Sequence, residues 1–365
     1  MQTIKLLSKK IGLYFFLIST ITSCVSTGNK KKFSDTPQKD DLNLAAMIQP
    51  ADSNSFFKDA NYYNWCHSIV KDTDGLYHMY YARFPKSIGF FSWLTNSEIA
   101  HAVAETPKGP YKEIGMVLKP RTNNWDQITL HNVKVNQFGD KYYMYYTSTN
   151  SDSVKLSSDM LAQIGHTGYS HKYWGLLRSN QRTGVAVSSS LNGPWKRFDE
   201  AMIQPHGAIK NITVNPSVSQ GADEKYYMII KGDALDKPGV IQAVGTSNSP
   251  RGPFKLENKP AFDDIPTEDV CMWFDKTRNR FYAIFHAHKS NFIGMITSVD
   301  GKNWQKAKHY EVCKKQIQMK DGTIMKVDRM ERPNIYIEDN EPVLLSFAVK
   351  KGNDAFIVFF DLFKK

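Results

Sequence analysis

The sequence predicts an all-β fold, a five-bladed β-propeller with about four antiparallel strands in each blade. A hairpin pattern, in which a short apolar strand turns at Asp, Gly or Asn and returns on a second strand, occurs five times, at 65–83, 125–150, 214–232, 268–288 and 331–349. A third apolar strand follows each copy, and the turns TPKGPY, SLNGPW and SPRGPF follow the first three. Repetition of strand-rich units favours a radial array over a β-sandwich, whose hairpins also alternate.

The repeats place the five blades at about 62–120, 124–205, 211–262, 267–310 and 329–363. A polar hairpin around Asp321 and Gly322 is expected between the last two blades, at 311–326.

Two further segments predict how the ring is closed and where a site lies. The sequence AMIQP at 46–50 recurs at 201–205, where it should form an outer strand, so we expect the N-terminal segment to add an outer strand to the last blade. Blade two has the main insertion, at about 151–179, between its second and third strands. A long loop on a rigid scaffold is a candidate wall or lid of a binding site.

The N-terminal residues have the composition of a targeting segment. Residues 1–24 combine lysines, a short apolar stretch and the ending ITSC, which resembles the site where bacterial lipoproteins are cleaved and lipidated, here on Cys24. Residues 25–41 are polar and lysine-rich, as in a flexible tether, and 42–365 form the propeller domain. These features predict a monomeric protein of the bacterial cell envelope, attached to the membrane through a lipid anchor.

Composition narrows the classes of partner. The formal net charge is +11, part of which lies in the leader and the tether. A mildly basic domain suits anionic glycans, such as sulfated or uronic-acid polymers, or has a solvated lysine-rich surface. The chain has no arginine-rich run, helix-turn-helix pattern or zinc-type spacing, so no nucleic acid partner and no metal are predicted. Beyond Cys24, the three cysteines Cys66, Cys271 and Cys313 form no disulfide framework.

Each hairpin opens with a pair of residues at an equivalent position. The pairs are Trp65-Cys66, His131-Asn132, Val214-Asn215, Glu268-Asp269 and Glu331-Arg332. Because inner strands surround the axis of a propeller, these pairs should converge on one face. Buried polar groups need partners or a use. They either hydrogen-bond one another to close the ring or form a site, and the mixture of Glu, Asp, His and Arg favours a site.

This arrangement resembles the five-bladed propeller glycoside hydrolases of families 43, 32 and 117, over most of the chain after the tether. The resemblance implies hydrolysis of an oligosaccharide derived from a plant or algal polysaccharide. Those enzymes place carboxylates where this chain has Cys66 in WCHSIV and Asn132 in HNVKV, so their residue roles do not transfer. The resemblance further implies that a histidine, here His131, can act as the acid, as in family 117. It is also compatible with a structural ion in the central channel, and implies no other cofactor.

Glycoside hydrolysis uses an acid and a base or nucleophile on opposite sides of the bond. We expect Glu268 to be the general acid or base and Glu331 its partner. Asp269 points to the other face of the strand and should orient a neighbour. His131 is an alternative acid, since its unperturbed pKa is about 6.5. Asp126, before the first strand of blade two, is a further carboxylate, more typical of a turn cap.

Substrate-binding residues are expected at the starts of first strands and the far ends of second strands. Trp65 suits a stacking platform for a sugar or a core position. Arg332 suits an anion clamp or the ion-pair partner of Glu331. The full predicted set is Trp65, His67, Arg83, Asn132, Asn215, Lys231, His286 and Arg332.

Three functions compete. An exo-acting glycosidase is favoured by the two glutamates and His131. A non-catalytic glycan-binding surface lipoprotein is favoured by Cys66 and Asn132, which stand where the similar enzymes have acids. A polysaccharide lyase would use His131 as base and Arg332 to neutralise a uronate.

Overall fold

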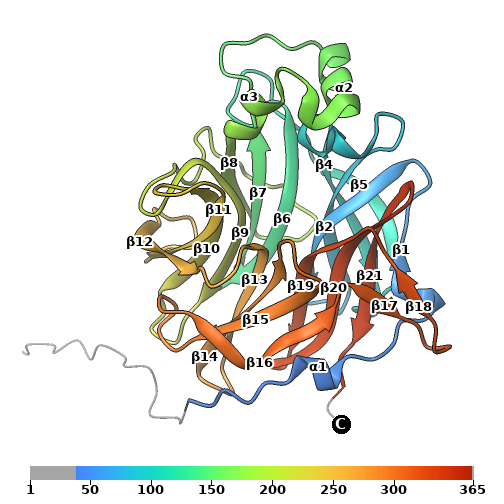
Figure 1. Cartoon of the computed structure of the whole chain (residues 1–365), viewed down its shortest axis with the longest axis vertical. Coiled ribbons are helices and arrows are strands. Elements are labelled where there is room, and N and C mark those ends of the chain that lie inside the picture. Colours follow the sequence, from blue (N-terminus) through green and yellow to red (C-terminus); the bar gives the residue numbers. More distant parts are fainter. Residues whose placement is uncertain (1–37, 364–365) are drawn as a thin grey trace, which may run out of the picture. The chain divides into compact units, whose positions relative to one another are not determined.

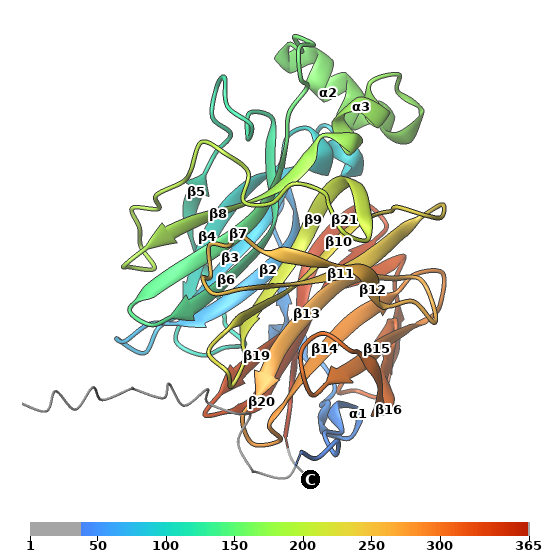
Figure 2. The ribbon, with the colours of Figure 1, turned by 90° about the vertical axis from the view of Figure 1, so that its left-hand side faces the viewer.

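The computed structural model describes residues 38–363, which belong to one compact unit. The predicted signal peptide 1–24, its lipidation site Cys24 and most of the tether lie outside the described residues. Five antiparallel sheets surround a central axis, as Figures 1 and 2 show, and this confirms the predicted five-bladed propeller. The first strands of neighbouring blades contact one another around the axis.

Three blades have four strands in sequence order, the first being innermost. Blade one consists of β2 (Tyr62–Lys71), β3 (Tyr77–Pro85), β4 (Glu98–Ala104) and β5 (Lys112–Leu118). Blade three consists of β9 (Ile209–Gln220), β10 (Tyr226–Ala234), β11 (Val240–Ser247) and β12 (Lys255–Phe262). Blade four consists of β13 (Thr267–Asp275), β14 (Arg280–Ala287), β15 (Phe292–Ser298) and β16 (Gln305–Lys314).

Blade two has three strands, β6 (Thr129–Phe138), β7 (Lys141–Thr149) and β8 (Gln181–Ser188). Its outer edge is held by two isolated bridges, from Thr183 to Ile203 and from Val187 to Lys196. The segment 201–205 therefore lies at the outer edge, where the repeat of AMIQP predicts it.

Blade five combines the two ends of the domain. It consists of β19 (Arg329–Glu338), β20 (Glu341–Lys351), β21 (Asp354–Asp361) and, outermost, β1 (Phe56–Phe57). In β1, Phe56 pairs with Val358 and Phe57 with Ile357. An N-terminal strand closes the ring, as predicted.

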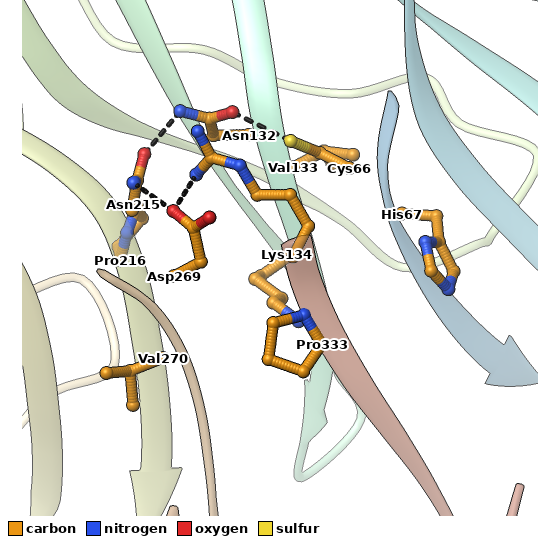
Figure 3. A pocket seen from close by; sticks show the side chains of 11 residues that line it. Cys66, His67, Asn132, Val133, Lys134, Asn215, Pro216, Asp269, Val270 and Pro333 are labelled. Atoms are coloured by element: carbon orange, nitrogen blue, oxygen red, sulfur yellow. Dashed lines mark hydrogen bonds and ion pairs between the residues drawn. The ribbon is translucent and has the colours of Figure 1, made fainter. Parts of the chain in front are cut away.

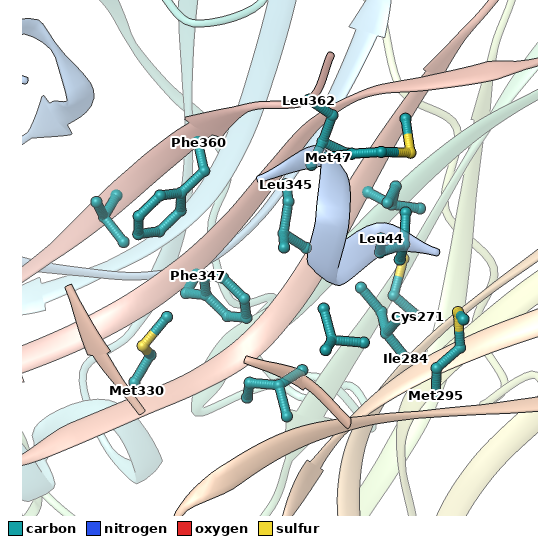
Figure 4. Close-up of a cluster of buried hydrophobic side chains, with 14 of the residues drawn as sticks. Leu44, Met47, Cys271, Ile284, Met295, Met330, Leu345, Phe347, Phe360 and Leu362 are labelled. Carbon is teal, nitrogen blue, oxygen red and sulfur yellow. The ribbon is translucent and has the colours of Figure 1, made fainter. Parts of the chain in front are cut away.

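The pairing predicted for 46–50 is present only in part. Ile48 forms one antiparallel bridge with Leu362, directly after β21, and Gln49 N donates to Asp361 O at 2.9 Å. The preceding residues Leu44–Met47 form the short helix α1, whose N-terminus is capped by the side chain of Asn43. The spacing of Leu44 and Met47 places both on one helix face, where they pack into the core that contains Leu345 and Phe347 (Figure 4). The aromatic pair of β1, with higher β propensity, pairs with the sheet edge instead.

The remaining short elements lie before the first strand or between strands. They are η1 (Ser53–Ser55), η2 (Phe90–Leu94), α2 (Ser158–Thr167), η3 (Gly168–Ser170), α3 (Trp174–Ser179) and the hairpin β17 (Gln316–Gln318)–β18 (Ile324–Lys326). This hairpin lies within the range predicted for one. The insertion of blade two is helical and lies beyond the ends of β7 and β8 (Figure 1). None of the helices in residues 38–363 is long and apolar enough to cross a membrane.

Candidate active site

Each inner strand has a β-bulge at its predicted opening pair, where the pairing register to the second strand shifts. The second residue of each pair has a positive φ, with values of 41° to 61° at Cys66, Asn132, Asn215, Asp269 and Arg332. Asn and Asp tolerate this left-handed conformation, whereas Cys and Arg adopt it rarely. Five equivalent bulges therefore point the two members of each pair in different directions.

The five second residues gather around the axis, and a chain of polar contacts joins them from Cys66 to Arg332 (Figure 3); this group is called the ring below. The Cys66 thiol donates to Asn132 Oδ1 over 2.8 Å, and Asn132 Nδ2 donates to Asn215 Oδ1. Asn215 Nδ2 donates to Asp269 Oδ1 over 2.8 Å, and Arg332 Nη1 lies 2.7 Å from the same oxygen. The cavity at this ring measures about 20 Å³, enough for a water-sized group. The ring therefore borders a cavity of about the size of one water molecule.

Charge and burial keep the ring in one protonation state. Burial raises the pKa of Asp269, but the Arg332 guanidinium, together with His286 and Lys231, outweighs this effect and holds the pKa below its usual range. Burial raises the pKa of the Cys66 thiol to about 12. At neutral pH the aspartate is ionised and the thiol is protonated, so it can donate. Two alternatives were considered for the opening pairs, mutual hydrogen bonding and formation of a site. Both hold, because the second residues contact one another in the ring and the first residues line a pocket.

A pocket with a volume of about 270 Å³ lies on one side of the ring. This volume is near the lower end of the range for small-ligand sites. The first residues of all five pairs line it, namely Trp65, His131, Val214, Glu268 and Glu331. Lys231 and His286, predicted from the far ends of second strands, also line it. The structure thus brings together three of the four predicted catalytic residues, and Asp269 lies beside them in the ring.

The two glutamates have different surroundings. The side chain of Glu268 is 19% exposed, and its carboxylate lies 3.4 Å from Lys231 Nζ. Burial raises the pKa of Glu268, but the nearby charges of Lys231, His288 and Arg332 together outweigh burial, so the pKa is lowered and the group is ionised at neutral pH. Glu331 lies 3.5 Å from Arg329 Nη1.

Two of the buried histidines that line the pocket have a ring nitrogen with no hydrogen-bond partner among the described residues, namely Nε2 in His131 and Nδ1 in His286. Burial lowers the pKa of His131 to about 3, so this imidazole is neutral at physiological pH. His286 Nδ1 lies 3.8 Å from Asp269 Oδ2. Because an unpaired buried nitrogen is unfavourable, both nitrogens are available to hydrogen-bond a ligand.

Aromatic side chains from the insertion of blade two form a wall of the pocket. Tyr169 and Trp174 line it together with Trp93 of η2. The Trp93 ring packs edge-on against Trp174 at 5.6 Å and against His131 at 5.4 Å. The prediction that the insertion forms a wall of the site is confirmed. Aromatic faces suit the apolar faces of sugar rings.

Two predicted binding residues do not reach the pocket. Arg83 pairs with Glu98 at 2.8 Å and with Glu113 on the outer strands, because β3 carries its side chain away from the axis. His67 follows the bulge and lines the small cavity at the ring, with Nε2 2.6 Å from Ser346 Oγ.

Asp126, considered as a further carboxylate, is fully buried and does not line the pocket either. It is held by Arg121 at 2.8 Å and by the Tyr146 hydroxyl at 3.0 Å. Its role is structural, in line with the turn-cap alternative.

Several residues that line the pocket were not predicted from the opening pairs of the hairpins. They are Phe90, Trp93, Tyr169, Trp174, Arg178, His288 and Arg329. The aromatic runs GFFSW and YSHKYW could have predicted the wall of the pocket. Exposure of clustered aromatic side chains to water is unfavourable, so such clusters in loops indicate a binding surface. Arg329 precedes Glu331 by two positions on β19, and strand alternation alone places it on the same face.

No model of a protein family matches the chain, and no curated protein matches it in sequence. Solved structures with a similar fold include a family 117 glycoside hydrolase of the marine bacterium Zobellia galactanivorans, with 14% identity, a TM-score of 0.62, and coverage of 88% of this chain and 92% of that one. An endo-arabinase from Bacteroides thetaiotaomicron has 12% identity and a TM-score of 0.53, covering 87% of this chain and 98% of that one. A family 43 β-xylosidase/α-arabinofuranosidase from a compost metagenome has 14% identity and a TM-score of 0.55, covering 87% and 96%. These similarities show that the chain has the five-bladed propeller fold found in glycoside hydrolases of families 117 and 43.

Proposed function

We propose that this protein is a glycoside hydrolase that releases sugar units from the end of an oligosaccharide derived from a plant or algal polysaccharide. The observation that carries the proposal is the pair of glutamates, Glu268 and Glu331, in one pocket at the propeller axis. Three members of the ring, Asn132, Asn215 and Arg332, line the pocket as well and are linked to one another through Asp269. A pocket bordered by a ring of linked side chains accommodates the end of a glycan chain better than its middle, which supports exo action.

In the proposed reaction, the ionised Glu268 carboxylate either takes a proton from the attacking water or itself attacks the anomeric carbon. Lys231, 3.4 Å away, keeps Glu268 in its charged form. Glu331, on the inner strand of the next blade, donates a proton to the leaving oxygen as the glycosidic C–O bond breaks. His131 is neutral and therefore serves as a hydrogen-bonding group for the sugar rather than as the acid.

We extend the proposal to anionic sugars, which carry a carboxylate or a sulfate. Four cationic side chains line the pocket beside the two glutamates, namely Arg178, Lys231, Arg329 and Arg332. Each has a carboxylate partner, so an anionic substrate would compete for cations that are already held in place. Trp65 and the aromatic wall of Trp93 and Trp174 would stack on the sugar ring.

The test is turnover of neutral, uronic and sulfated oligosaccharides by the protein without residues 1–24. Glu268→Gln and Glu331→Gln should each lower kcat by roughly 10²–10⁴-fold, with unchanged melting temperatures. Glu311→Gln, a matched change at an ion pair with Lys314 on the outer strand β16, should leave turnover unchanged. Full activity in both pocket variants would refute the assignment.

The same experiment separates the two competing functions. A glycan-binding module is favoured by the ion pair of Asp269 with Arg332, because this pair occupies one of the carboxylates near the pocket. Such a module would show tight binding of the glycan by the wild type without turnover. A lyase would release an unsaturated sugar that absorbs ultraviolet light. The lyase is disfavoured because Arg332 already pairs with Asp269 and a His131 with a low pKa is a weak base.

We also propose that the protein is monomeric and is held at the bacterial cell envelope by a lipid on Cys24. The sequence ITSC at 21–24 supports the lipid anchor. Cells expressing the full chain should incorporate radiolabelled palmitate into the protein, and Cys24→Ser should abolish the label. Light scattering of the delipidated protein measures its mass. Label in the Cys24→Ser variant would rule out this anchor.

A further inference from the structure

A second group of polar side chains lies at the far end of blade one from the pocket. Asp72, Asp74 and His78 gather at the hairpin between β2 and β3, and one ligand atom from each lies within 4.8 Å of the others. Trp65, which lines the pocket, precedes Asp72 by seven residues. At the rise of a β-strand, the two sites are therefore roughly 20 Å apart. This cluster is independent of the proposed glycosidase site.

His78 is held with one nitrogen directed at the carboxylates. Its side chain is buried, with a relative exposure of 1%. Nδ1 lies 2.9 Å from His101 Nε2, and the two rings stack at 4.9 Å. His101 in turn stacks on Tyr80 at 4.7 Å with nearly parallel rings. These contacts fix the orientation of the His78 imidazole.

The other nitrogen of His78 has no partner. Nε2 forms no hydrogen bond with any described residue. The nearby carboxylate oxygen, Asp72 Oδ2, is 3.8 Å away, which is too long for a hydrogen bond. A buried polar atom without a partner is rare in native proteins and indicates a water or an ion.

The two aspartates each keep an oxygen available. Asp72 Oδ1 accepts from Thr73 N at 2.7 Å, and Asp74 Oδ1 accepts from Leu76 N at 3.0 Å. Within residues 38–363, these hydrogen bonds involve Oδ1 and leave Oδ2 of each aspartate to a ligand. The adjacent Lys71 pairs with Glu338 at 2.6 Å instead of with either aspartate.

We propose that Asp72, Asp74 and His78 bind one divalent transition-metal ion, of which Zn²⁺ fits best. One imidazole nitrogen with two carboxylate oxygens matches the ligand types of Zn²⁺, whereas Ca²⁺ and Mg²⁺ prefer oxygen ligands alone. A metal-binding histidine usually donates its other N–H to a neighbouring group, and His101 Nε2 is placed to accept it. Three protein ligands leave a coordination position for water, and the exposed Asp74 gives the ion a path from solvent.

A second group of Glu268, Asp269 and His286 has similar geometry in the pocket. There, Lys231 lies 3.4 Å from Glu268 and Arg332 lies 2.7 Å from Asp269. These two cationic side chains already form ion pairs with the carboxylates and would repel a metal ion. The hairpin cluster is therefore the better candidate, and the pocket cluster provides the matched control.

The test uses the mature protein after chelator treatment, titrated with Zn²⁺ by calorimetry and with Co²⁺ by visible absorption. We expect one ion per chain and a higher melting temperature with Zn²⁺. His78→Gln and Asp74→Asn should each weaken Zn²⁺ binding at least 10-fold. Asp74 is an exposed turn residue, so Asp74→Asn tests the site even where His78→Gln folds poorly. Excess Ca²⁺ should not displace the metal.

His286→Gln should bind Zn²⁺ like the wild type. The proposal is overturned by wild-type protein that binds no Zn²⁺ or Co²⁺. It is equally overturned by binding that survives both hairpin variants, or by binding that is lost in His286→Gln. Anomalous scattering from Zn²⁺ beside His78 Nε2 would locate the ion directly.

Discussion

Replacing Asp269 by Asn removes the single negative charge of the ring and keeps the shape of the side chain. The carboxylate is 1% exposed and lies 2.7 Å from the Arg332 guanidinium. Removal of one partner of a buried ion pair costs about 3–5 kcal/mol. Because Arg332 retains 18% exposure, we expect the lower end, ~3 kcal/mol. With an unfolding entropy of roughly 0.6 kcal/mol/K for about 300 residues, the melting temperature should fall by ~5 °C.

The assay is urea and thermal unfolding of wild type, Asp269→Asn, Arg332→Met and the double variant. The double variant should be more stable than the sum of the single effects predicts, because neither charge is then left unpaired. Asp199→Asn is the control. Its side chain also pairs with an arginine, Arg121, but is 87% exposed, so its effect should stay within ~0.5 kcal/mol.

The effect of Asp269→Asn should depend on pH in a definite direction. The folded-state pKa of Asp269 is lowered, so its contribution is fully present above the unfolded pKa of about 3.9. It is lost as the pH falls through the folded-state pKa. The gap in stability between wild type and Asp269→Asn should therefore narrow below about pH 4. A gap under ~1 kcal/mol at pH 7, or strictly additive effects of the two single variants, would refute the structural role of the ring.

Three further predictions follow from buried groups. Trp174→Ala should raise KM for oligosaccharides roughly tenfold with little change in kcat, because it removes stacking area; steady-state kinetics measure both, and a fall in kcat alone would contradict the wall. Burial raises the pKa of the Cys66 and Cys313 thiols to about 12, so both should resist a thiol reagent at pH 8 until the protein is denatured, as titration of thiols can show. Burial lowers the pKa of His131 to about 3. Below about pH 6.5 the imidazole is therefore protonated in the unfolded state but not in the folded state, so the free energy of unfolding should decrease as the pH is lowered. His131→Gln should flatten this slope in urea midpoints between pH 7 and 4, and an unchanged slope would show that His131 titrates normally.

The repeated hairpins were sufficient to predict the blades, because alternation of apolar residues and turn residues is local in sequence. The match between 46–50 and 201–205 predicted the contact that Ile48 makes with Leu362, but not the paired strand β1. In β1, Phe56 and Phe57 pair with β21, and their position depends on a sheet edge about 300 residues away in sequence. Local propensity could not distinguish this contact from the helix at Leu44–Met47.

The sequence predicted that the opening pairs gather at one place, but not which member of each pair lines the pocket and which belongs to the ring. A straight strand sends neighbours to opposite faces, and this placed Glu268 and Asp269 apart. The bulge adds a left-handed residue that turns the second member into the ring. Asn132, Asn215 and Asp269 are types that tolerate this conformation, and their recurrence at one position was a usable signal. Arg83 was misplaced because its ion-pair partners, Glu98 and Glu113, lie on the outer strands β4 and β5 of the same blade, beyond the hairpin from which its position was predicted.

The ring also has a direction. Protons are donated one way from Cys66 through Asn132 and Asn215 to Asp269, and Arg332 approaches the same oxygen from the other side. An amide side chain can be flipped with its oxygen and nitrogen exchanged, and its orientation follows from its partners. Here the aspartate accepts only, so it orients Asn215, which orients Asn132, which in turn requires a donor at Cys66. The charge of one residue in blade four thus determines which atoms donate and which accept in side chains of three other blades.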